Sequence, residues 1–162
     1  MSNPSIKQIY RFPTEFIENV LVLPNGKLLL STFKSPGPPY IPDPTATEPQ
    51  AKPVASFDKG ITGLTGIVPL ENGLYAVSGG LHTSFSFQRG SMKLFTVSLQ
   101  SGKVVDSIPV PDTATMNGLA ILPYNPHVVL SADSIEGRIF AIDTHTREVS
   151  VIFENIDLGS SG

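Results

Sequence analysis

The chain has 162 residues, 40% of them hydrophobic and only 15% charged, which suits one folded domain and excludes a wholly disordered chain. With a net charge of −3, the chain lacks the excess of basic residues that is typical of nucleic-acid-binding proteins. Without cysteine it has no disulfide, thiolate metal site or cysteine nucleophile. No run of about 18 apolar residues and no signal-peptide core is present, so we expect a soluble, cytoplasmic protein that binds neither membrane nor nucleic acid.

Short apolar or alternating runs, bounded by turn residues, follow one another along the chain and predict β-strands. They occupy residues 20–23, 28–31, 74–77, 94–97, 128–131, 138–142 and 149–153. Sequences such as Asn25-Gly26, Asn72-Gly73 and Ser101-Gly102 between them have hairpin-turn chemistry. No window of a dozen residues follows a helical period without a proline or glycine. The chain is therefore predicted to be all-β.

Three segments of the chain are similar to one another. Residues 18–31, 65–78 and 117–131 each read as strand, turn and strand, and their starts lie 47 and 52 residues apart. The second and third continue into another hairpin, which gives the four strands of a propeller blade. We predict a β-propeller with three four-stranded blades at about 14–60, 61–111 and 112–156. A β-sandwich is the alternative, but it needs no such self-similarity.

A proline-rich stretch interrupts the first repeat. Residues 35–53 contain seven prolines, so they cannot form a central strand and are predicted to be a long loop. By analogy with the other repeats, the loop lies on the face where the innermost strands begin. It is either a tolerated surface insertion or a lid over a ligand pocket.

The third repeat carries a family resemblance. Its motifs Asn117-Gly-Leu, Ala132-Asp-Ser and Gly137-Arg-Ile resemble the gluconolactonase-like superfamily, which includes senescence marker protein and luciferin-regenerating enzyme. The resemblance extends over residues 15–155 and implies a six-bladed propeller. Residues 1–162 would then be the N-terminal half of one propeller domain. The missing half would come from the same protein or from a second copy of the chain.

In lactonases of this superfamily a divalent cation, usually calcium, is held by oxygen ligands from several blades. The resemblance implies that Glu18 and Asn117 are metal ligands if this chain is a metal-dependent lactonase. Thr65 occupies the equivalent position of the second repeat and is a poor ligand. The remaining ligands of the family would lie in later blades.

Other members of the superfamily come from natural-product clusters and include pericyclases of the hetero-Diels-Alderase type. The low charge, the proline-rich loop and the pair Phe85 and Phe87 favour this group, because a hydrophobic substrate needs an apolar, aromatic cavity. We therefore expect an enzyme without cofactor that positions a hydrophobic small molecule for a hetero-Diels–Alder cyclisation. The alternatives are a divalent-metal-dependent lactone hydrolase and a non-catalytic propeller that serves as an interaction module.

Eight residues are candidates for the site. Glu18 and Asn117 hold matching repeat positions and predict one axial site, although Asn117 could also only cap a turn. His82, in the second repeat's loop on the same face, is a general acid or a plain surface residue. The predicted catalytic residues are Glu18, Asn117 and His82, and the predicted substrate-binding residues are Thr65, Tyr40, Phe85, Phe87 and Ser134.

Three further residues have structural predictions. Asp133 is expected to hydrogen-bond the backbone of a neighbouring loop rather than to take part in chemistry. His127 and His145 are predicted in hairpin turns on the opposite face, exposed to solvent.

Overall fold

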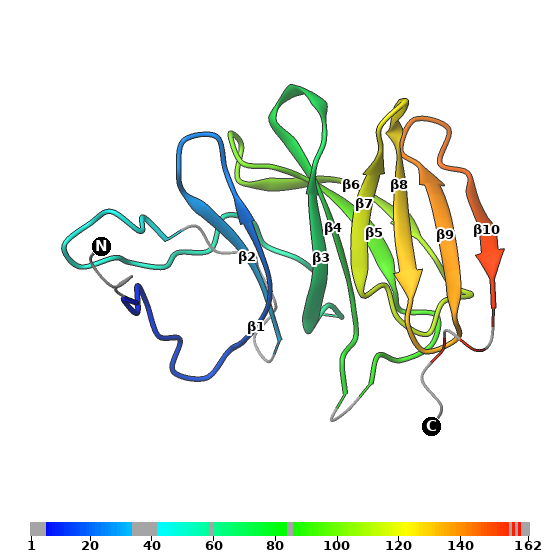
Figure 1. Ribbon diagram of the computed structural model, residues 1–162, viewed down its shortest axis with the longest axis horizontal. Coiled ribbons are helices and arrows are strands. Elements are labelled where there is room, and N and C mark those ends of the chain that lie inside the picture. Colours follow the sequence, from blue (N-terminus) through cyan, green and yellow to red (C-terminus); the bar gives the residue numbers. More distant parts are fainter. Residues whose placement is uncertain are drawn as a thin grey trace, which may run out of the picture.

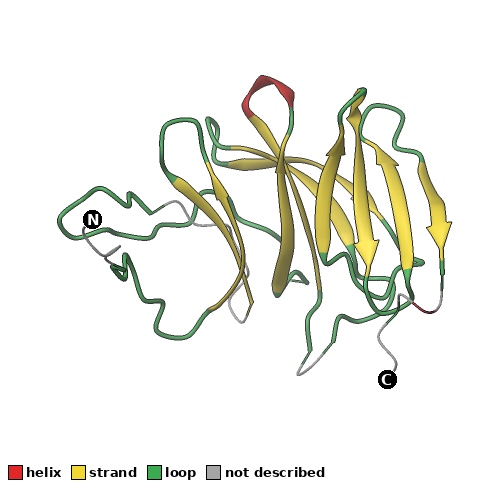
Figure 2. Cartoon of the chain, viewed as in Figure 1, coloured by secondary structure: helices red, strands yellow, loops and turns green. Residues whose placement is uncertain are grey.

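The computed structural model describes residues 6–33, 42–58, 60–83, 86–155, 157 and 159. Strands dominate this part of the chain, and helix is confined to short 3-10 turns such as η1 (Glu71–Gly73) (Figure 2). The prediction of an all-β chain is confirmed. Within these residues, none of the helical segments has the length and apolar character needed to cross a membrane.

In the part of the chain that the structure describes, ten strands form two antiparallel sheets (Figure 1). In the six-stranded sheet each strand pairs with the next along the chain, and the four-stranded sheet has the order β10-β9-β8-β7. The strands are β1 (Phe16–Val22), β2 (Leu28–Phe33), β3 (Gly63–Pro69), β4 (Leu74–Gly80), β5 (Lys93–Ser98), β6 (Lys103–Pro109), β7 (Gly118–Leu122), β8 (Asn125–Asp133), β9 (Arg138–Asp143) and β10 (Val149–Glu154).

The strands fall within the three predicted repeats. The second repeat forms the consecutive strands β3–β6 and the third forms β7–β10, four each as expected. The first repeat contributes only β1 and β2 within the described residues, not four strands, and β2 meets β3 through the single pair Phe33 and Gly63. The described segment 42–58 contains four of the prolines, which cannot donate hydrogen bonds to a sheet. The described residues show stacked sheets and no closed ring of blades.

Two hydrophobic cores lie on opposite sides of the β3–β6 strands. One core packs these strands against β1, β2 and the segment that precedes β3, and it includes Leu29, Leu64 and Val77. The other packs them against β7–β10 and includes Ala76 and Val129. Because successive residues Ala76 and Val77 of β4 enter different cores, the middle repeat is covered on both faces.

A close approach of β3 and β7 brings the second and third repeats together. A Cβ atom on Gly66 would lie 2.4 Å from Leu119 Cγ and 2.9 Å from the Leu119 backbone nitrogen. Only a residue without a side chain fits there, so Gly66 sets how closely the two strands approach.

Replacing Gly66 with alanine should therefore destabilise the protein. We expect Gly66→Ala to lower the free energy of unfolding by about 1–3 kcal/mol, since the new methyl group forces β7 away. Gly118→Ala in β7 is the matched control, because a Cβ at Gly118 meets no atom within 4 Å. Chemical denaturation measures both; equal stability of the two variants would contradict the close approach.

Candidate functional site

An open pocket of about 260 Å³ is lined by residues from all three repeats, near one end of their strands. The described residues among the predicted site lie together here, and Tyr40 and Phe85 lie outside the described residues. The pocket is lined by Glu18, Phe33, Thr65, His82, Ser86, Phe87, Thr115, Asn117, Ser134 and Ile135. The first repeat supplies Glu18, the second Thr65 and His82, and the third Asn117 and Ser134. The matching repeat positions thus converge on one cavity.

Thr65 in β3 is buried in the floor of this pocket. Its hydroxyl donates to the Met116 carbonyl at 2.5 Å and lies 2.8 Å from the Ser78 hydroxyl. Its carbonyl accepts a hydrogen bond of 2.5 Å from the Ser31 hydroxyl. Because the hydroxyl of Thr65 is already bonded, the residue shapes the floor and joins the three repeats.

Glu18 and Asn117 lie at the mouth of the pocket on β1 and just before β7. Partial burial raises the pKa of the Glu18 carboxyl above its ordinary value of 4.5. No hydrogen bond to the described protein lowers it. The Asn117 amide nitrogen is 3.4 Å from the Ser134 hydroxyl. Both side chains can therefore offer hydrogen bonds to a ligand.

An aromatic wall, made of Phe33, His82 and Phe87, forms one side of the pocket. The His82 ring stacks on Phe33 with centroids 4.6 Å apart and planes 3° apart. Phe87 meets Phe33 and His82 edge-on, at 5.8 and 5.1 Å between centroids. The Thr62 hydroxyl accepts from the His82 backbone N–H at 2.8 Å and donates to the His82 carbonyl at 2.9 Å. The imidazole is thus fixed from its backbone and from both neighbouring rings.

Phe33 was not predicted as a site residue. In the repeat alignment it corresponds to Asp133, which is the last residue of the second strand of the third repeat, on the same face. This alignment could have indicated that Phe33 lies near the site. The sequence did not show that β2 and β3 pair only at Phe33 and Gly63, where the Phe33 ring stacks on His82.

Asp133 organises two loops of the pocket, as predicted. Its Oδ2 accepts hydrogen bonds from the Thr113 hydroxyl and the Ala114 N–H, each at 2.8 Å. Its Oδ1 accepts from the N–H groups of Ile135 and Glu136 at 3.1 Å. The carboxylate is 1% exposed, so it holds the loops that carry Thr115 and Ser134 and does not itself face the cavity.

The residues of this pocket do not by themselves fit a calcium ion. Glu18 and Asn117 provide oxygen donors, whereas the Thr65 hydroxyl is used within the protein. Calcium takes about six to eight oxygen ligands. Among the residues that the structure describes, no group of three or more His, Asp or Glu side chains could hold a metal ion.

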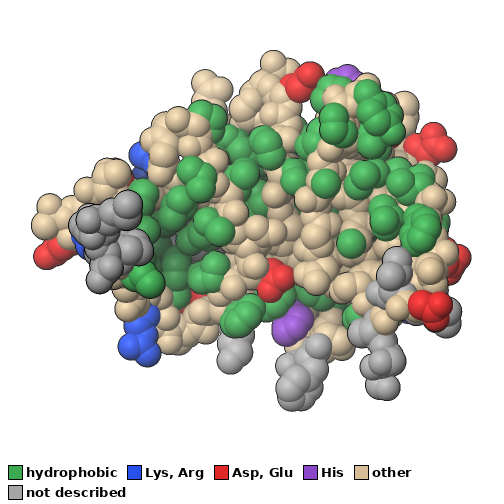
Figure 3. Space-filling model, viewed as in Figure 1, with side chains coloured by type: hydrophobic (Ala, Val, Ile, Leu, Met, Phe, Trp, Pro, Cys, Tyr) green, Lys and Arg blue, Asp and Glu red, His purple; other side chains and the backbone are tan. Residues whose placement is uncertain are grey.

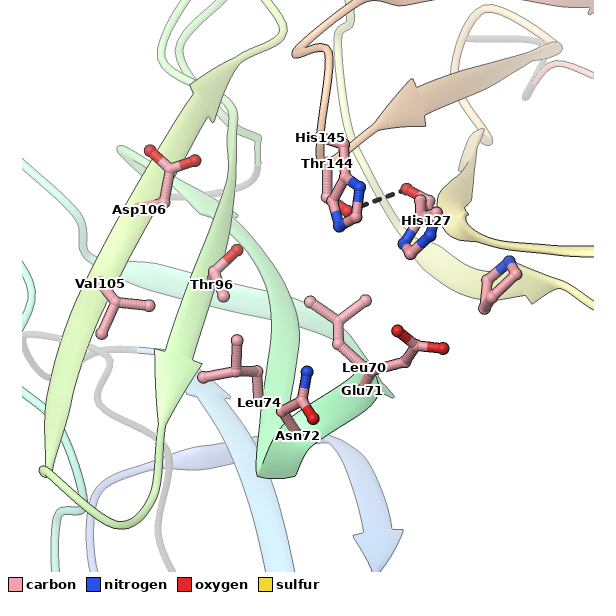
Figure 4. A pocket seen from close by; sticks show the side chains of 11 residues that line it. Leu70, Glu71, Asn72, Leu74, Thr96, Val105, Asp106, His127, Thr144 and His145 are labelled. Atoms are coloured by element: carbon pink, nitrogen blue, oxygen red, sulfur yellow. Dashed lines mark hydrogen bonds between the residues drawn. The ribbon is translucent and has the colours of Figure 1, made fainter.

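A second pocket, of about 220 Å³, lies at the opposite hairpin ends, and the described residues that line it include no predicted site residue (Figure 4). His127 and His145 stack here with ring centroids 3.6 Å apart. His145 is exposed in the turn after β9, as expected. His127 instead lies within β8 and is half-buried. Asp106 nearby is bound by the Arg147 guanidinium at 2.5 Å, which lowers the pKa of its carboxyl.

Comparison with known proteins gives one informative similarity. The chain is 24% identical over 160 residues to a protein of Phoma sp. described as a "Putative hetero-Diels-Alderase". The match covers 85% of this chain and 46% of that protein, so the chain spans about half the length of the relative. No family model matches the chain.

Removing the Asp133 carboxylate should destabilise the loops around the pocket. We expect Asp133→Ala to lower the free energy of unfolding by about 2–4 kcal/mol, because several buried donors lose their acceptor. Asp143→Ala is the control, since its carboxylate accepts from His145 and Thr146 within one exposed turn, and its loss should be much smaller. Urea denaturation compares them, and equal losses would show that Asp133 has no special role.

The Glu18 carboxyl should titrate above its ordinary pKa. Because burial raises the pKa of Glu18 in the folded protein, the folded chain keeps this proton at pH values at which the unfolded chain has lost it. The resulting stabilisation is complete below the unfolded pKa and is lost as the pH rises through the folded one. Carboxyl-carbon NMR titration measures both Glu18 and Asp106, whose pKa is lowered. A Glu18 pKa at or below 4.5 would contradict the prediction.

Proposed function

We propose that this chain belongs to a biosynthetic cyclase that positions a hydrophobic small molecule for a hetero-Diels–Alder reaction. The observation that carries the proposal is the composition of the pocket, which combines the aromatic wall with the partly buried carboxyl of Glu18, for which the described residues provide no hydrogen bond that lowers its pKa. The similarity to the Phoma protein supports it. As an enzyme of this type, the chain would need no metal or organic cofactor.

The reaction places few chemical demands on a protein. In a hetero-Diels–Alder cyclisation, an α,β-unsaturated carbonyl group reacts with an alkene. One C–C bond and one C–O bond form as two π bonds are consumed, and no proton, electron or co-reactant is needed overall. Catalysis therefore consists mainly of holding the two partners at near-attack distance, which removes part of the entropic barrier.

The aromatic wall is suited to the conjugated part of such a substrate. Stacked and edge-on rings prefer flat, polarisable partners, and Phe33 and Phe87 flank His82 in this arrangement. The aromatic wall would hold the unsaturated carbonyl group of the substrate in one orientation. In this proposal the wall determines which face of the heterodiene meets the alkene.

The polar residues would act on the carbonyl oxygen. As the reaction proceeds, electron density increases on this oxygen, so a hydrogen-bond donor placed there stabilises the transition state. The raised pKa of Glu18 makes its protonated, donating form more available. The Asn117 amide and the His82 ring are the other donors that we propose, and Ser134 would assist through Asn117. Tyr40 and Phe85 stay predictions as substrate-binding residues.

We also propose that the repeats are blades of a larger propeller, with residues 1–162 as its N-terminal half. The two complete four-stranded repeats and the sheet-on-sheet packing support this arrangement.

A metal-dependent lactonase is the second candidate function, because Glu18 and Asn117 offer oxygen atoms in the same cavity. A propeller that serves only as an interaction module is the third.

A direct assay would supply a substrate that carries an unsaturated carbonyl group tethered to an alkene. We expect the protein to accelerate cyclisation and to enrich one stereoisomer over the uncatalysed mixture. His82→Leu should slow the catalysed rate at least about tenfold, equivalent to ~1.4 kcal/mol, because the wall loses its fixed ring. His145→Leu, at the opposite end of the molecule, is the matched control and should leave the rate unchanged.

The assay also separates the other candidates. An identical rate and stereoisomer ratio with and without protein would contradict the cyclase. Lactone hydrolysis that is abolished by a chelator and restored by calcium would establish the lactonase instead. Absence of small-molecule binding at this pocket, measured by calorimetry, would favour the interaction module.

A further inference from the structure

Two adjacent residues at the start of β3, Thr62 and Gly63, support the aromatic wall, and neither is among the described residues that line the pocket. Gly63 is paired with Phe33 of β2 on one side and with the end of β4 on the other. Just after β4, His82 is paired with Phe87 through an isolated β-bridge. Near the lower ends of β3 and β4, Figure 3 shows a histidine beside hydrophobic side chains. Backbone pairing around Gly63 thus places all three members of the wall.

Gly63 leaves the space that the Phe33 ring occupies. A Cβ atom on Gly63 would lie 2.8 Å from Phe33 Cδ1 and 2.9 Å from His82 Cβ. Non-bonded carbon atoms pack at about 3.5–4.0 Å, so even a methyl group would overlap with both residues. A close approach of this kind is a common reason for glycine within a strand. The stack of Phe33 on His82, with centroids 4.6 Å apart, therefore depends on the absence of a side chain at Gly63.

Thr62 holds the other partner of the stack. Its hydroxyl accepts a hydrogen bond from the His82 N–H at 2.8 Å and donates one to the His82 carbonyl at 2.9 Å. The backbone N–H of Thr62 in turn donates to the Gly80 carbonyl at 3.0 Å. His82 cannot move away from a new side chain at Gly63 without loss of these hydrogen bonds. The Phe33 ring would have to move instead.

We propose that Thr62 and Gly63 are positioning residues that determine the stereochemical outcome of the cyclisation. This inference rests on the proposed cyclase function. Thr62 holds the imidazole of His82 and Gly63 lets Phe33 stack on it, so the conjugated group of the substrate meets the wall in one orientation. A preference for one stereoisomer is a difference between the energies of two transition states, so a small displacement of the wall changes it.

The ratio of product stereoisomers separates a positioning role from a loss of stability. A partly unfolded variant makes less product, but its folded fraction gives the wild-type ratio once the uncatalysed product is subtracted. A displaced wall changes the ratio itself. We expect Gly63→Ala to lower the ratio of the major to the minor stereoisomer by about threefold or more. Gly60→Ala is the matched control, because a Cβ at Gly60 meets no atom of the described residues within 4 Å, and it should keep both ratio and rate.

A second pair of variants tests the hydroxyl of Thr62. Thr62→Val removes the hydroxyl and should also lower the stereoisomer ratio, because the His82 N–H and carbonyl lose their common partner. Thr62→Ser keeps a hydroxyl and should retain the wild-type ratio. A wild-type ratio in Gly63→Ala or Thr62→Val would overturn the proposal, and so would a Thr62→Ser variant that behaves like Thr62→Val.

Histidine NMR signals test the stack without any substrate. The chain has three histidines, and the His82 ring lies over the face of Phe33, whose ring current moves the His82 proton signals upfield. We expect Gly63→Ala to move these signals downfield. The signals of His127 and His145, which stack on each other in the second pocket, should stay in place and show that the variant is folded. Unchanged His82 signals would overturn the proposal.

The two measurements distinguish this inference from the function on which it rests. A wild-type protein that does not accelerate cyclisation would contradict the cyclase, whereas a downfield shift of the His82 signals in Gly63→Ala would still support the role of Gly63 in the stack. An active wild-type protein whose stereoisomer ratio is unchanged in Gly63→Ala would leave the cyclase standing and overturn the positioning role.

Discussion

The hydrogen bonds around Thr65 connect the three repeats and determine where the candidate site forms. Its carbonyl accepts from Ser31 of the first repeat, and its hydroxyl donates to the Met116 carbonyl at the start of the third. Gly66 beside it allows β7 to approach within contact distance. Because these contacts are buried, they are strong and difficult to replace with water. They bring the strand ends of three different repeats to one cavity.

The chemistry of the pocket follows from this convergence. Polar groups at its mouth come from the first and third repeats, and the aromatic wall combines a residue of the first repeat with two of the second. The buried carboxylate of Asp133 holds the loops that the third repeat contributes to the pocket, and its charge does not face the cavity. A cavity with one rigid aromatic side and few charges is better suited to orienting an apolar substrate than to binding a sugar. In the cyclase that we propose, this arrangement would act mainly by positioning the substrate.

Local signals in the sequence predicted the all-β class and turns such as Asn72-Gly73, but they placed His127 in a hairpin turn, whereas it lies within β8. Asn72-Gly73 was predicted as a hairpin turn, and both residues adopt the positive φ that such turns require. Repeat alignment placed Glu18, Thr65 and Asn117 at matching positions, and all three line one pocket. Phe33 was not predicted because its place in the pocket depends on ring stacking with His82, which is distant in the sequence. Within its described residues the first repeat has two strands and not the expected four, because the prolines of segment 42–58 cannot donate hydrogen bonds to a sheet.

The central claim is that one ligand site is shared by all three repeats. The most direct measurement is an NMR titration of the labelled protein with the bicyclic cycloaddition product, following backbone amide and aromatic ring signals. The account predicts saturable shifts at Glu18, His82 and Asn117 together, with ring-current shifts in the Phe33 signals. Shifts confined to the pocket of His127 and His145, or to a single repeat, would contradict it.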